Sequence, residues 1–64
     1  RMLVYTTNKA IKQKFLDMGI TLKEEKEVNE ITYSFFRLNN PSIINNFSYE
    51  ENKEIVICKN TLFF

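Results

Sequence analysis

The chain has 64 residues, of which 44% are hydrophobic and 27% charged, and its formal net charge is +1. One cysteine and no histidine exclude an intrachain disulfide and a zinc site of the usual cysteine and histidine type. The balanced charge gives no independent argument for nucleic acid, and no apolar run approaches the roughly 20 residues of a membrane span. We therefore expect a single domain, residues 1–64, stabilised by a dense aromatic core or by a partner subunit.

The first predicted elements are a strand over MLVYT, residues 2–6, and a helix over KAIKQKFLDM, residues 9–18. Thr7 or Asn8 can cap this helix, because the side-chain oxygen of either accepts an amide hydrogen of the first turn. One face of the helix carries apolar residues at the i, i+4, i+7 spacing, namely Ile11, Phe15 and Met18. This is the face that we expect to be buried.

Gly19 is predicted to end the helix in the left-handed conformation, with Ile20 folding back onto Phe15. Apolar and polar residues then alternate over residues 20–25, which predicts a half-exposed strand. The polar stretch KEEKEVNE follows, and its turn is expected near Asn29.

The strongest strand signal is ITYSFFRL, residues 31–38. One face of this strand would carry Ile31, Tyr33 and Phe35. The other begins polar and becomes apolar, with Thr32, Ser34, Phe36 and Leu38. Either that second face is covered at one end, or a bulge after Phe35 changes the register.

The segment after this strand leaves two alternatives for residues 41–49. An Asn cap followed by Pro41 indicates a short helix with Ile43, Ile44 and Phe47 buried, whereas the asparagine-rich composition is equally typical of a loop. KEIVIC, residues 53–58, predicts a last strand buried on both faces, and residues 61–64 a short final strand. The predicted class is therefore α+β: a small, mainly antiparallel sheet with one well-defined helix on one face, in the order β-α-β-β-(α)-β, which echoes the ferredoxin-like order.

The residue inventory argues against catalysis. Without histidine the commonest general base is missing, and the single glycine excludes a phosphate-cradling loop. Cys58 lies in an apolar run and is interpreted as core filler, and the Glu and Lys run over residues 23–30 as a solvated turn. We expect no enzyme activity, cofactor, metal or small-molecule substrate.

The opening VYTTNKAIKQKFLDMGITL resembles short uncharacterised domains of low-GC bacteria and their phages. That resemblance implies a small regulatory, accessory or host-takeover protein that acts by binding. The composition, rich in Asn, Lys and Ile, is typical of the same AT-rich sources. A single thiol and the lack of an apolar leader favour the cytoplasm, and Arg1 before Met2 is interpreted as a cloning remnant.

Protein–protein contact is the favoured function, with a protein partner or a second copy as in a homodimer. One helix can cover only one face of a small sheet, so apolar residues are expected to remain exposed and to mark an interface. The candidate contact residues are Leu16, Phe36, Leu38, Leu62, Phe63 and Phe64. The competing explanation is that residues 62–64 fold back and complete the domain's own core.

Two further hypotheses stay open. A weak nucleic-acid-binding module would use the basic residues Lys9, Lys12, Lys14 and Arg37, and Tyr33 and Phe35 could stack on bases as in RNA-binding sheets. A self-assembling accessory protein would instead pair its sheet edges between copies.

Overall fold

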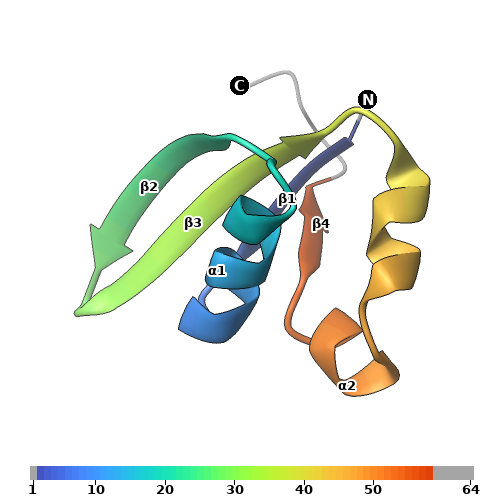
Figure 1. Cartoon of the computed structure of the whole chain (residues 1–64). Coiled ribbons are helices and arrows are strands. Elements are labelled where there is room, and N and C mark those ends of the chain that lie inside the picture. The colour runs from blue at the N-terminus through green and yellow to red at the C-terminus, as the bar shows by residue number, and fades with distance from the viewer. Residues whose placement is uncertain (1, 59–64) are drawn as a thin grey trace.

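The computed structural model describes residues 2–58 and shows the predicted α+β class (Figure 1). Its elements, in chain order, are β1 (Met2–Thr6), α1 (Lys9–Asp17), β2 (Leu22–Val28), β3 (Ile31–Leu38), the 3₁₀-helix η1 (Pro41–Asn46), α2 (Tyr49–Asn52) and β4 (Val56–Cys58). The predicted order β-α-β-β-(α)-β is confirmed. The strand predicted over residues 61–64 lies outside the described residues.

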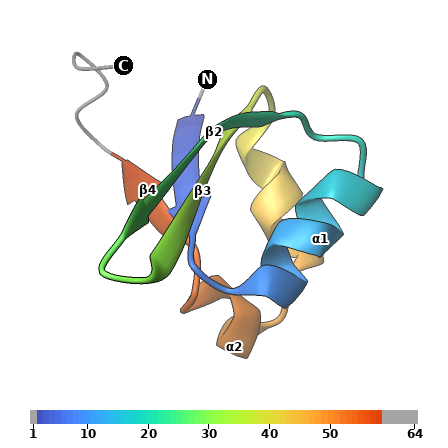
Figure 2. The same cartoon turned by 90° about the vertical axis from the view of Figure 1, so that its left-hand side faces the viewer.

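The four strands form one sheet in the order β2-β3-β1-β4, and all neighbours are antiparallel. This is the ferredoxin-like arrangement, with η1 and α2 in place of a full second helix. Helices α1 and η1 lie on the same side of the sheet (Figure 2). Between residues 2 and 58, no helix covers the opposite side, which we call the open face.

Helix α1 has the capping residues that were predicted for it. The Asn8 side chain accepts hydrogen bonds from the amides of Ala10 and Ile11, at 2.8 and 3.1 Å. Gly19 has a φ of 83°, and the Ile20 amide donates to the Phe15 carbonyl at 3.1 Å, as in a Schellman ending. Met18 was expected on the buried face but is the exposed C-cap residue, because the helix ends one residue earlier than predicted.

The hairpin of β2 and β3 turns at Asn29 as predicted, although β2 is longer than expected. Asn29 and Glu30 have φ values of 53° and 69°, a two-residue turn that matches the twist of the strands. Most of the charged residues that were interpreted as a solvated turn belong to β2 instead. They are exposed, because β2 is an edge strand and most of its side chains face water.

Of the two alternatives for the second face of β3, coverage at one end is confirmed, since Phe36 and Leu38 are buried. A bulge does occur, but on the partner strand, where Lys23 is the extra residue between Leu22 and Glu24.

The core lies between the sheet and the helices. Its buried members are Val4, Ile11, Phe15, Phe36, Leu38, Phe47 and Ile55. The Phe15 ring lies 4.7 Å from the Phe36 ring and 5.0 Å from that of Phe47. Burial of these side chains is the main source of stability, since each gains roughly 1.5–3 kcal/mol relative to exposure.

Residues 41–49, for which both a helix and a loop were considered, form short helical turns. Asn40 caps η1 by accepting from the Ser42 amide at 3.0 Å, and Pro41 follows at the first position. Of the three residues expected to be buried, Phe47 is buried and Ile43 and Ile44 are partly buried. The prediction that residues 53–58 form a doubly buried strand is wrong, because Val56 and Ile57 are exposed and β4 pairs only with β1 among the described strands.

Candidate functional site

The open face of the sheet carries a cluster of aromatic side chains at its centre. Tyr5 on β1 is opposite Phe35 on β3, and cross-strand partners share a face. The Tyr5 ring lies 5.6 Å from the Tyr33 ring in an edge-to-face arrangement and 5.3 Å from the Phe35 ring. Phe35 is buried, whereas the two tyrosines are half-buried. The cluster thus presents two partly exposed phenol rings to its surroundings.

Exposed aliphatic residues extend this cluster in both directions along the open face. Val56 on β4 is opposite Tyr5 and is 42% exposed. Ile31, two residues before Tyr33, pairs with Val28 near the hairpin tip, and both are exposed. Together they form a continuous apolar strip, made of Val28, Ile31, Tyr33, Tyr5 and Val56.

Charged residues lie beside the strip rather than within it. Lys26 is opposite Tyr33 and Glu24 is opposite Phe35, and their ammonium and carboxylate groups are 3.6 Å apart. Arg37 is two residues beyond Phe35 on the same face of β3 and is exposed. The strip therefore has an apolar centre with a polar rim, the usual anatomy of a protein interface.

The structure does not bring the predicted protein-contact residues together. Phe36 and Leu38 are fully buried in the core, so the prediction that they form an exposed patch is wrong. They point to the side of the sheet that α1 covers, where the buried Ser34 hydroxyl is satisfied by the Glu25 carboxylate at 2.8 Å. Leu16 is exposed, but it lies on α1, away from the open face. The remaining three, Leu62, Phe63 and Phe64, lie outside the described residues.

The predicted nucleic-acid contacts are also separated. Lys12 is 2.6 Å from the Glu25 carboxylate, which holds the pKa of that carboxyl below its ordinary value. Lys14 is 3.1 Å from Glu51 and 4.6 Å from the centre of the Phe47 ring. Lys9 and Lys12 line a groove of about 400 Å³ beside α1, whereas Arg37 lies on the open face. Two of the four cations are therefore neutralised within the chain, and no common basic surface results.

Cys58 at the end of β4 is a free, half-buried thiol. Burial raises its pKa, so the thiol is protonated near neutral pH and is a poor nucleophile. No group of three or more Cys, Asp or Glu side chains within residues 2–58 could hold a metal ion. The same part of the chain contains no helix long and apolar enough to cross a membrane.

Sequence reasoning identified Ile31, Tyr33 and Phe35 as one face of a strand but did not add Tyr5 and Val56. The available signal was the alternation in MLVYT, which sets Tyr5 on the side opposite Val4. The split order of the strands then makes β1 the neighbour of both β3 and β4. Comparison of the chain with protein-family models, curated proteins and solved structures found no match.

Proposed function

We propose that this protein is a non-enzymatic protein-binding module and that its binding site is the apolar strip on the open face. One observation supports this most directly: Val56, Ile31 and Val28 remain exposed in line with Tyr5 and Tyr33. Large apolar side chains gain roughly 1.5–3 kcal/mol each when they are removed from water. A domain this small gains most from covering such a strip with a partner.

The chemistry of the strip favours a protein as the occupant. Tyrosine is enriched at interfaces because its ring supplies a large contact area and its hydroxyl still forms a hydrogen bond at the rim. Aliphatic neighbours such as Val56 and Ile31 complement apolar side chains and offer nothing to a phosphate. The resemblance of the first half of the chain and its AT-rich composition favour a phage or mobile-element modulator of a host protein as the biological setting.

Val56 and Ile57 provide a matched pair for testing the proposal. They are adjacent in β4 and are 42% and 44% exposed, yet Val56 is opposite Tyr5 on the open face and Ile57 is opposite Val4 on the other. Val56→Asp should abolish binding, whereas Ile57→Asp should leave it intact.

Binding would be measured in two ways. Light scattering coupled to size exclusion detects self-association, and a two-hybrid screen against a genomic fragment library detects other proteins. An interaction that survives Val56→Asp, or one that both variants remove equally while each stays folded by circular dichroism, would contradict the proposal. Large assemblies on size exclusion would support the self-assembling alternative instead.

A second candidate function is supported by the aromatic cluster itself. The two central strands carry Tyr5, Tyr33 and Phe35, with Arg37 on the same face. Proteins that bind single-stranded nucleic acids present aromatic and basic side chains in this way, and the bases stack on the aromatic rings. Fluorescence anisotropy of labelled dT12 and U12 oligonucleotides at low salt tests it. Binding that falls with salt and is lost in Tyr33→Ala would favour this function, and the absence of binding would remove it.

A further inference from the structure

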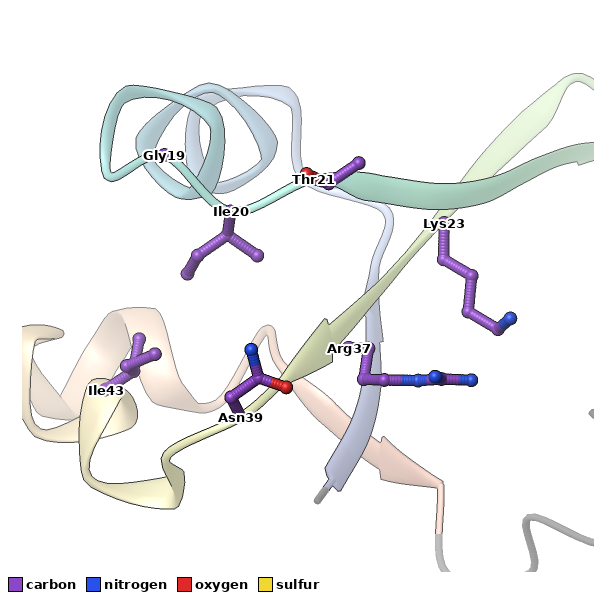
Figure 3. Close-up of a pocket in the computed structure, with 7 residues that line it drawn as sticks. All are labelled: Gly19, Ile20, Thr21, Lys23, Arg37, Asn39 and Ile43. Atoms are coloured by element: carbon purple, nitrogen blue, oxygen red, sulfur yellow. The ribbon is translucent and has the colours of Figure 1, made fainter.

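Two cations lie side by side where β2 begins and β3 ends. Lys23 is the bulge residue of β2, and Arg37 is the penultimate residue of β3. Figure 3 shows the Lys23 side chain running down from β2 and the Arg37 side chain running sideways from β3, with both charged ends on the side of the pocket away from Ile20 and Ile43. The inserted residue in β2 is what places the lysine beside the arginine.

Four of the seven cations in residues 2–58 are paired with a glutamate, and Lys23, Arg37 and Lys9 are not; Lys9 lies apart from the pair, in the groove beside α1. Lys12, Lys14, Lys26 and Lys53 each lie within 4.0 Å of a glutamate oxygen. Neither Lys23 nor Arg37 has such a carboxylate from residues 2–58. Two cations that line one pocket without a carboxylate from residues 2–58 can both be paired by a single anion supplied from outside the domain.

The surroundings of the pair form a shallow pocket of about 360 Å³. Its lining includes Lys23 and Arg37 at one side and the apolar side chains of Ile20 and Ile43 at the other (Figure 3). The Asn39 amide lies between the two sides and adds a hydrogen-bonding group. A ligand with one anionic group and an apolar part would match the two cations on one side of this pocket and the apolar side chains on the other.

We infer that the protein bound on the apolar strip inserts an acidic side chain between Lys23 and Arg37. The inference rests on the proposed function, because Arg37 lies on the open face two residues beyond Phe35, so a partner that covers the strip and extends past Phe35 reaches it. The guanidinium can hold a carboxylate through two parallel hydrogen bonds, and the ammonium adds a third. The apolar strip then supplies affinity and the cation pair supplies selectivity for partners with Asp or Glu at this point.

A carboxylate fits better than a nucleic-acid backbone. Only two unpaired cations line this pocket. A series of phosphates would need several cations along its path. A single acidic side chain needs only the two.

Titration with sodium acetate tests the anion site without any partner. Amide shifts followed by two-dimensional NMR should concentrate at Lys23, Arg37 and Asn39, beyond those caused by sodium chloride at equal ionic strength. The changes should vanish in the double variant Lys23→Gln and Arg37→Gln and persist in Lys9→Gln, which alters an exposed lysine elsewhere. Shifts that are absent, or unchanged in the double variant, would overturn the inference.

Selection of phage-displayed random 12-residue peptides tests the partner chemistry. The natural sequence should enrich peptides that combine apolar residues with Asp or Glu. Lys23→Glu with Arg37→Glu should weaken binding of those peptides about tenfold or more and enrich Lys or Arg instead.

The possible failures separate the two proposals. Peptides that need Val56 but show no acidic preference would overturn the cation-pair inference and leave the protein-binding function standing. If no peptide is enriched, both fall together. If the natural sequence binds dT12 and the variant Lys23→Glu with Arg37→Glu does not, the pair recognises a phosphate backbone and the inference is wrong.

Discussion

The ammonium group of Lys14 lies 3.1 Å from the carboxylate of Glu51, although the two residues are 37 positions apart in the chain. The same ammonium donates to the Asn46 carbonyl at 3.1 Å and lies over the Phe47 ring. Glu51 in turn accepts from the Ser48 amide at 2.8 Å and closes a capping box at the start of α2. Lys14 thus links the segment that contains η1 and α2 to helix α1 through three contacts.

Replacing this lysine should loosen that segment. Lys14→Met keeps most of the alkyl chain but removes all three polar contacts, so we expect a lower midpoint of urea unfolding and faster amide exchange in residues 41–52. Lys53→Met is the control, because Lys53 makes an exposed pair with Glu50 within a single turn. Equal effects of the two substitutions would show that the fastening by Lys14 contributes nothing.

Phe36→Ala should lower the stability of the fold far more than a substitution at an exposed position would. Phe36 is fully buried against Phe15, and truncating a buried phenylalanine costs about 3–5 kcal/mol. That is comparable to the whole stability of a domain this small, so the variant should be largely unfolded by circular dichroism. Ile57→Ala, at an exposed position, should change stability by about 0.5 kcal/mol or less. A folded Phe36→Ala variant would contradict the core described above.

The misplacement of Phe36 illustrates where sequence reasoning stops. Both faces of β3 carry aromatic residues, so alternation separates Tyr33 and Phe35 from Phe36 without telling which face the helix covers. That depends on the side from which α1 crosses between β1 and β2, which is a property of the whole chain. The ends of α1 were predictable, because Asn8 and Gly19 act through contacts within a few residues. The candidate site was only half predictable, since Tyr5 and Val56 reach Tyr33 through long-range pairing.

Gly19→Ala should destabilise the protein through the backbone alone. The glycine has a φ of 83°, and a Cβ added there would meet no atom within 4 Å. The expected cost is about 1–2 kcal/mol, measured by urea unfolding, from the left-handed conformation that L-residues avoid. D-alanine at the same position in a synthetic chain should be neutral or stabilising, because it favours that conformation. Destabilisation by both enantiomers would refute this explanation.

Glu30→Gly should stabilise the hairpin. Asn29 and Glu30 both have positive φ, and a turn of this type prefers Asn-Gly. Relieving the strain at Glu30 should raise stability by about 1 kcal/mol. Glu27→Gly, placed within β2, should instead lower it. Thermal unfolding of the two variants gives the comparison, and a lower melting temperature for Glu30→Gly would count against the turn geometry.

Acid should weaken the link between α1 and β2. Hydrogen bonds from Lys12 and Ser34 lower the pKa of Glu25, so this carboxylate stabilises the fold above its unfolded pKa of about 4.3. The contribution is lost as pH falls through the folded pKa, when the native state must take up a proton. Glu25→Gln should therefore flatten the pH dependence of urea unfolding below about pH 4.3, while Glu27→Gln, at an exposed position of the same strand, should leave it unchanged. Parallel curves for the natural sequence and Glu25→Gln would disprove the assignment.

The pairing of β1 with β4 has a consequence for the order in which the protein can fold. β1 is the first strand, and its Leu3 is opposite Cys58 at the far end of the described chain. Pairing β1 directly with β4 would close a loop of about 50 residues at an entropic cost of roughly 3–4 kcal/mol, whereas a prior pairing of β1 with β3 shortens the loop that β4 has to close. On the ribosome, a nascent chain can build the β2–β3 hairpin and the β1–β3 pairing early. One edge of β1 then stays unpaired until residues 56–58 have been synthesised.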